Sequence, residues 1–357
     1  MSILPSSIPD CSYVKGNLGE NINLLMGELR TSDNIVYTIP PQVIEELNRN
    51  VGISSSFYKF LCKKNPSLWE ENFKELYNHY YQGNITFLVS EGEIISYTLA
   101  ERLPLLNSQF FSVADSMLSD YTNEIEVASS SYSVESATAN FCVLSKQEFL
   151  KGEEVYRVGV LLLNSEVGTV TCQLVVLEGE DKWYYLPSKY YNLSAARYNR
   201  STKDSEEAFK VLLLRVISDV LSKEYLSGKV DDFFCHKQVC KHVNLTYEEF
   251  RYVLRTLRRA AVNSDMDESE QETLLDNLSD YHGDFEKNYP LLEDQEASYI
   301  WRCSAVSDYS IMMLVDKIQD ILRCHVFYEE SLMELKNLLG AFVINDKIAT
   351  ELAKRKV

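Results

Sequence analysis

Apolar positions in the first part of the chain recur at the spacing of a helix. The pattern predicts three short helices, at Pro41–Asn50, Ser55–Lys63 and from Ser67 to Gly83. Ser67 and Glu70 have the spacing of a capping box, which marks the start of the third helix. Residues 1–40 show little periodicity apart from one candidate helix at Asn21–Leu29. We therefore interpret residues 1–40 as an N-terminal extension.

The middle of the chain has the pattern of β-strands. Val155–Leu186 predicts three consecutive strands, with Asn164–Gly168 and Gly179 in the two turns between them. The first strand is apolar on both faces after Val158, which indicates a central strand covered from both sides. Other predicted elements are strands at Ile85–Val89, Ile94–Leu99, Glu124–Ser131 and Ala137–Leu144 and a helix at Phe110–Leu118. Together they predict a mostly antiparallel sheet of about six or seven strands across residues 84–187.

From Ser205 the pattern is helical nearly to the end of the chain. The predicted helices are Glu206–Leu226, Tyr247–Val262, Asp308–Phe327 and Tyr328–Leu339. An acidic stretch, Asp265–Glu296, lies between the second and the third. The fold class is therefore α+β, with the sheet flanked by N-terminal helices and a helical C-terminal region. We divide the chain into the extension at 1–40, an α+β core domain at 41–204 and a helical region at 205–357.

The charge of the chain restricts its partners. The 357 residues contain 35 Lys and Arg against 53 Asp and Glu, a net charge of −18. A uniformly acidic surface repels phosphate, so nucleic acid would need a locally basic surface. The eight cysteines have no disulfide-framework spacing, and we find neither a signal peptide nor an apolar run long enough to cross a membrane. We therefore expect a cytoplasmic protein that has no membrane partner.

Three blocks of the sequence occur in an order that is also found elsewhere. They are GISSSFYKFLCKKNPSLWEENF, ITFLVSEGEIISYTL and YRVGVLLLNSEVGTVTCQLVVL. The most specific element is the turn formed by Asn164, Ser165, Glu166 and Gly168, with Gly159 on the strand before it. Over residues 42–200 the chain resembles an uncharacterised protein family carried by bacteriophages, plasmids and prophages.

This resemblance implies an origin in a mobile element and a location in the cytoplasm of a bacterial host. It favours a role in nucleic-acid transactions or in a contest with the host, and it implies no settled activity. Members of the family often continue into an Arg-x-x-Cys-x-Asn-Gly segment and a His-containing loop. This chain has PSKYYNLSAARYNR there, without Cys or His. If that loop binds the family's ligand, this chain binds it differently or has lost the function.

The motif turn has two interpretations. Asn, Ser and Gly are the residue types that a hairpin turn prefers, so the turn can be purely structural, with Glu166 solvated at its tip. Alternatively, the tip presents Glu166 to a partner.

Two cationic stretches are candidates for binding nucleic acid. In the first, Lys189, Arg197 and Arg200 would hold phosphates, and Tyr191 and Tyr198 would stack on unpaired bases. The alternative is a solvated connector that its tyrosines anchor to the core.

The second stretch is the predicted helix Tyr247–Val262, in which Arg251, Arg255 and Arg258 share one face. They would extend the phosphate track. The alternative is that acidic side chains of Asp265–Glu296 neutralise this face.

The sequence contains no motif that identifies an enzyme. It has no phosphate-binding Gly-rich loop, no Gly-x-Ser-x-Gly and no His-Glu-x-x-His, so we assign no catalytic residue and no cofactor. Cys235-His236 and Cys240-x-His242 do not have the spacing of a closed zinc site, and we assign no metal.

Two hypotheses follow. The first is a non-catalytic accessory protein of phage or plasmid type that binds single-stranded nucleic acid in replication or recombination, with a homo-oligomer as one option. This hypothesis also draws on an analogy between the three strands followed by a long helix and the β-β-β-α unit of single-strand annealing proteins. The alternative is an acidic module that engages a host or phage protein as a mimic of nucleic acid, which the net charge of −18 favours.

Overall fold

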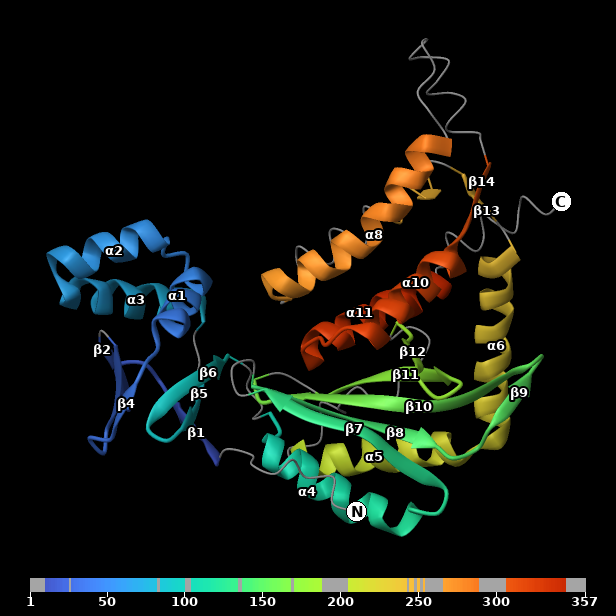
Figure 1. Cartoon of the computed structure of the whole chain (residues 1–357). Helices are drawn as coiled ribbons and strands as arrows, with labels where there is room; N and C mark the ends of the chain where they lie inside the picture. Colours follow the sequence, from blue (N-terminus) through green and yellow to red (C-terminus); the bar gives the residue numbers. More distant parts are fainter. Residues whose placement is uncertain are drawn as a thin grey trace.

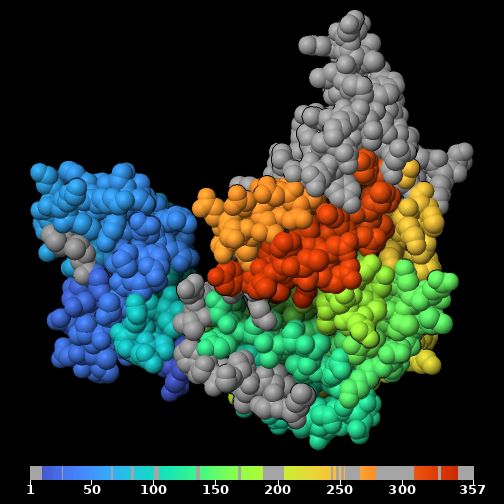
Figure 2. Space-filling model, viewed as in Figure 1, coloured from blue at the N-terminus to red at the C-terminus, as the bar shows by residue number. Residues whose placement is uncertain are grey.

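A computed structural model describes residues 10–25, 27–81, 84–99, 104–133, 137–167, 170–187, 205–242, 244–246, 249–250, 253, 266–288 and 306–344. The predicted α+β class is confirmed. Two main hydrophobic cores are present, one within residues 18–97 and a larger one within residues 105–344. Figure 2 shows the N-terminal part, in blue, as a lobe beside the larger body of the molecule.

The N-terminal lobe is built on a mixed six-stranded sheet in the order β1-β5-β6-β4-β3-β2. Its strands are β1 (Cys11–Gly16), β2 (Ile22–Leu25), β3 (Glu28–Thr31), β4 (Val36–Thr38), β5 (Ile85–Ser90) and β6 (Glu93–Thr98). Strands β4 and β6 are parallel and the other neighbours are antiparallel. The predicted helix at Asn21–Leu29 is wrong, because Leu24 pairs with Leu29 across the turn at Gly27, whose φ is +84°.

Three helices cover this sheet, and all three were predicted from the sequence. They are α1 (Pro41–Asn50), α2 (Ser55–Lys64) and α3 (Pro66–Tyr80). The predicted capping box at Ser67 is wrong: α3 begins at Pro66, and its N-cap Asn65 makes no side-chain capping bond. Proline suits the first position of a helix because its missing N–H would have no partner there. Trp69 anchors α3 by donating its indole N–H to Asn48 Oδ1 at 2.8 Å.

The body contains a second, antiparallel sheet in the order β12-β11-β10-β8-β7, with β9 also paired to β10. Its strands are β7 (Ile125–Ser133), β8 (Thr138–Ser145), β9 (Phe149–Lys151), β10 (Glu154–Ser165), β11 (Thr171–Glu178) and β12 (Lys182–Tyr185). The predicted three consecutive strands are therefore adjacent antiparallel neighbours. The strands predicted as one sheet are divided between two, because β5 and β6 pair with the N-terminal strands instead.

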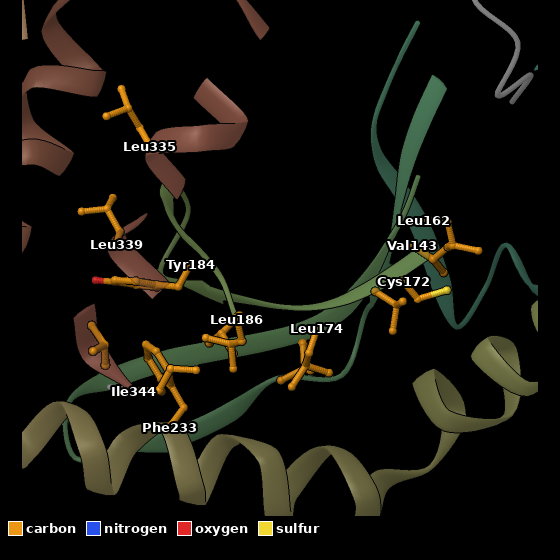
Figure 3. Packing of buried hydrophobic residues seen from close by; sticks show 14 of the residues in the cluster. Val143, Leu162, Cys172, Leu174, Tyr184, Leu186, Phe233, Leu335, Leu339 and Ile344 are labelled. Atoms are coloured by element: carbon orange, nitrogen blue, oxygen red, sulfur yellow. The ribbon is translucent and has the colours of Figure 1, made fainter. Parts of the chain in front are cut away.

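Both faces of the central strand β10 are covered, as predicted. Val160 and Leu162 belong to the main core, which includes α4 (Asn107–Leu118), α5 (Ser205–Leu221) and α6 (Lys223–His242). Leu161 faces the other side, where Tyr185 packs near Met333 of α11 (Glu329–Val343). Figure 1 shows α4 and α5 on one side of this sheet and α10 and α11 on the other, and Figure 3 shows the packing of Tyr184, Phe233 and Leu339.

The C-terminal helices differ in part from the prediction. The predicted helix Glu206–Leu226 is divided into α5 and α6, because the hydroxyl of Ser222 accepts from Tyr225 N at 3.3 Å and starts a new helix. Helix α6 then continues through Gly228 to His242, beyond the predicted end at Leu226. The acidic stretch contains α8 (Glu268–Asn288), where no helix was predicted.

The remaining elements complete the body. They are the 3-10 turn η1 (Ser119–Tyr121), β13 (Asn244–Thr246), β14 (Val306–Ser310) and α10 (Ile311–Cys324). Strands β13 and β14 form a small antiparallel pair. Of the helices described, none has the length and apolar character that a membrane crossing requires.

Candidate functional site

The motif turn is buried rather than solvated. Glu166 follows directly after β10 and is only 4% exposed. One of its carboxylate oxygens accepts a hydrogen bond of 2.8 Å from the backbone N–H of Asn107, the first residue of α4. Asn164, also buried, donates to Leu105 O and Asn107 Oδ1, both at 2.8 Å. These contacts support the structural interpretation of the turn, and they leave Glu166 inaccessible to a partner in this conformation.

The same turn also joins the two lobes. Tyr13 of β1 donates its hydroxyl proton to the backbone oxygen of Glu166 at 2.8 Å. Around this bond a small apolar cluster combines Cys11 and Leu88 of the N-terminal sheet with Ala137 of the body. Burial raises the pKa of Glu166, although the Asn107 N–H opposes that shift, and burial also raises the pKa of Cys11 to about 11. The turn is therefore a structural junction between the lobes.

The predicted nucleic-acid-binding residues lie outside the described residues. This holds for Lys189, Tyr191, Arg197, Tyr198, Arg200, Arg251, Arg255 and Arg258, and also for Gly168 of the motif turn. Ser165, the remaining residue of the motif, is the last residue of β10, and its hydroxyl accepts from Val167 N at 3.4 Å.

Both histidines and one of the two cysteines of α6 have hydrogen-bond partners within the protein. His236 Nδ1 lies 2.7 Å from Asp232 O, and His242 Nε2 lies 3.2 Å from Gln238 Oε1. Cys240 is buried and its thiol donates to Val343 O at 3.4 Å, whereas Cys235 is exposed. Within the described ranges, no group of three or more His, Cys, Asp or Glu side chains is arranged to hold a metal ion.

A buried lysine lies between two carboxylates in the body of the protein. The Nζ of Lys237 on α6 donates to Glu178 Oε1 at 2.6 Å, to Glu154 Oε2 at 2.9 Å and to Tyr156 Oη at 3.3 Å. The side chain of Lys237 is 4% exposed. Tyr184 donates to the other oxygen of Glu178 at 3.2 Å, and Tyr156 also donates to Glu154. Sequence reasoning missed this group because its members come from four separate elements.

The chemistry of this group is that of a structural ion-pair network. Three donations from one nitrogen require an ammonium group, so Lys237 has no lone pair with which to act as a nucleophile. Burial opposes the charge of Glu154, but hydrogen bonds from Tyr156 and Lys237 lower its pKa overall. Burial, together with the neighbouring carboxylates, raises the pKa of both tyrosines, which stay protonated as donors. The network fixes α6 against one end of the sheet.

A different kind of surface is found on α2 of the N-terminal lobe. The helix starts at Ser54, whose hydroxyl accepts from Phe57 N at 3.3 Å. It ends at Asn65, which is extended (φ −162°, ψ 103°) because a residue before proline disfavours the helical conformation. Of its ten residues, only Leu61 is buried. Tyr58 also faces the lobe, with its ring 5.6 Å from that of Trp69.

The outer side of α2 combines aromatic rings with positive charge. Phe57 and Phe60 are 45% and 54% exposed, and their rings are nearly parallel, with centroids 6.5 Å apart. Lys59, Lys63 and Lys64 are exposed on the same helix, which has no acidic residue. We call these five side chains, Phe57, Lys59, Phe60, Lys63 and Lys64, the α2 surface.

The α2 lysines differ from many cations of the body. Ion pairs with carboxylates there involve Lys151, Arg157, Lys182, Lys210, Arg215, Lys237 and Arg323. No carboxylate among the described residues forms an ion pair with Lys59, Lys63 or Lys64. The α2 surface therefore provides the local positive charge that an acidic chain needs to attract an anion.

Sequence reasoning identified α2 as a helix but did not identify its surface. The missed signal was composition: SSFYKFLCKK has three lysines and no acidic residue in a chain with 53 Asp and Glu. The spacing of Phe57, Phe60 and Lys64 places them on one side of the helix. Only the structure shows that this side points to solvent.

Comparison with known proteins adds no relative from which a role could be transferred. Neither a protein-family model, nor a curated protein, nor a solved structure matches the chain.

Proposed function

We propose that this chain is a non-catalytic accessory protein of phage or plasmid type that binds single-stranded nucleic acid. The observation that carries the proposal is the α2 surface, where exposed phenylalanine rings and lysines share one helix. Proteins that bind single strands combine cations along the backbone with aromatic rings on which bases stack. The near-parallel rings of Phe57 and Phe60 offer two such faces, and Lys59, Lys63 and Lys64 would neutralise phosphates.

The cationic segments predicted from the sequence are part of the same proposal. Lys189, Arg197 and Arg200 would add phosphate contacts, Tyr191 and Tyr198 would add stacking, and Arg251, Arg255 and Arg258 would extend the track. The net charge of −18 repels phosphate, and each basic patch must overcome part of this repulsion. Binding through several basic patches therefore suits this chain.

Binding to a fluorescently labelled single-stranded oligonucleotide, measured by anisotropy over a range of salt concentrations, tests the proposal. Log K for binding falls linearly with log salt concentration. The double variant Lys63→Ala with Lys64→Ala should make this slope shallower by about 1.4, since each lost phosphate contact removes about 0.7. Replacing Phe57→Ala and Phe60→Ala should weaken binding by about 1–3 kcal/mol per stacked base and leave the salt slope nearly unchanged.

Two control variants test whether the loss of any exposed lysine or any exposed apolar side chain would weaken binding in the same way. Lys223→Ala removes an exposed lysine from α6, and Leu150→Ala removes a side chain that is 68% exposed on β9. Neither should alter binding. Arg197→Ala combined with Arg200→Ala tests the predicted connector separately. If the protein does not bind the oligonucleotide at low salt, the proposal is wrong.

The net charge supports a second candidate function, a protein-interaction module that mimics nucleic acid. Such a module would engage a basic nucleic-acid-binding protein of the host or of the phage, with an attraction that salt weakens. Capture of such a partner from host lysate, released by salt and competed by added nucleic acid, would favour this alternative. Capture that nucleic acid does not compete would exclude mimicry.

A further inference from the structure

Helix α5 exposes apolar side chains on a face that no described element of the chain covers. Its exposed residues are Glu207, Val211, Leu214, Arg215 and Ser218, which form one stripe along the helix. Val211 and Leu214, at the centre of the stripe, are 60% and 54% exposed. The other apolar side of α5, including Phe209 and Val216, is buried in the main core.

The neighbouring helices do not share this feature. Helix α4 packs against α5, with the rings of Phe110 and Phe209 4.9 Å apart, yet its exposed positions are Ser108, Gln109, Ser112 and Ser116. Along most of its length, the exposed positions of α6 are charged. The apolar centre of the α5 stripe is therefore particular to this helix, and the short α4 side chains beside it would let another helix approach closely.

We propose that α5 docks against α5 of a second copy of this chain, antiparallel and with the two-fold axis at Val211. In this register, two residues lie at the same level of the interface, one on each copy, when their residue numbers add up to twice 211. Glu207 then faces Arg215 of the second copy, and the symmetry repeats this opposite-charge pair on the other side of Val211.

Charge complementarity selects this arrangement over a parallel one. In a parallel pair Glu207 would face Glu207 and Arg215 would face Arg215, and like charges repel. Arg215 makes only a loose contact within its own helix, with its Nε 3.9 Å from Asp219 Oδ2, and its side chain is 42% exposed, so it can turn towards a second copy. Two crossing helices bury a small area, so we expect a dimer of micromolar affinity.

Sedimentation equilibrium of the full chain over a range of concentrations tests this inference without any nucleic acid, so its outcome is separate from that of the proposed function. The native protein should show a reversible monomer–dimer equilibrium. Val211→Asp with Leu214→Asp should produce monomers, and far-UV circular dichroism should stay unchanged because both side chains are exposed. Leu150→Asp, an equally exposed apolar position on β9, should leave the equilibrium unaltered.

Charge exchange tests the register. Glu207→Arg should raise the dimer dissociation constant by about tenfold or more, and adding Arg215→Glu should restore it, because the pair is then rebuilt with its signs reversed. A monomeric native protein at high micromolar concentration would overturn the inference. A dimer that survives Val211→Asp with Leu214→Asp would also overturn it, since the interface would then lie elsewhere.

Discussion

The carboxylate of Glu166 accepts a hydrogen bond of 2.8 Å from the backbone N–H of Asn107, 59 residues earlier in the chain. Glu166 thus places a negative charge at the positive end of α4, whose own N-cap, Leu106, has no side-chain oxygen to bind the free N–H groups. Tyr13 from the other lobe binds the backbone of the same residue. One turn therefore caps a helix and connects the two lobes.

Glu166→Gln should make the protein less sensitive to pH. Burial raises the folded-state pKa of Glu166 above its value in the unfolded chain. The resulting stabilisation is therefore fully present below the unfolded pKa and is lost as pH rises through the folded pKa. Chemical denaturation across this range should show the native protein losing stability relative to Glu166→Gln as pH rises.

Glu166→Leu should destabilise the protein more than Glu166→Gln. The leucine leaves the Asn107 N–H buried without an acceptor, which costs about 1–3 kcal/mol, whereas glutamine retains a carbonyl oxygen. Urea denaturation of both variants at one pH measures the difference. Equal stability of the two would show that the Asn107 contact does not stabilise the fold.

Lys237→Met should destabilise the protein by about 3–5 kcal/mol, since it leaves two carboxylates, those of Glu154 and Glu178, without their cation. Lys223→Met, an exposed lysine at the start of the same helix, should have an effect below about 0.5 kcal/mol. Thermal and urea denaturation measure both. A small effect of Lys237→Met would mean that the network contributes little to stability.

Gly340→Ala and Gly228→Ala should change stability in opposite directions, although both glycines are in helices. A Cβ at residue 340 would lie 2.1 Å from the backbone oxygen of Tyr185, so α11 would have to move away from β12. We expect a loss of about 1–3 kcal/mol. At Gly228 nothing lies within 4 Å, and alanine should add about 0.4–1 kcal/mol through the unfolded chain.

Glu270→Ala should weaken two helices together. Glu270 N donates to Asp267 Oδ1 at 2.8 Å, and Glu270 Oε2 accepts from Asp267 N at 3.3 Å, which is a capping box at the start of α8. The same carboxylate accepts from Ser331 Oγ at 2.6 Å and from Tyr328 N at the start of α11. The loss should be about 2 kcal/mol, with Glu268→Ala, exposed in the same turn, as the nearly neutral control.

Local sequence patterns were enough to predict much of the fold. The apolar runs of Val155–Leu186 and the turn residues between them were enough to predict three antiparallel neighbours, because a hairpin requires only contacts between residues close in sequence. Helices α1, α2 and α3 were predicted for the same reason. The predicted helix at Asn21–Leu29 failed because a short apolar segment is compatible with either structure until a partner strand is known.

The sequence by itself determined the α+β class, the order of strands β10 to β12 and the excess of negative charge, since these depend on local spacing and composition. Only the tertiary structure decided that β5 and β6 pair with the N-terminal strands, that Glu166 is buried under α4 and that Lys237 meets Glu154 and Glu178. It also decided which sides of α2 and α5 remain exposed. The physical reason is that burial and long-range pairing depend on what the rest of the chain places against each element, and a periodic pattern does not identify that partner.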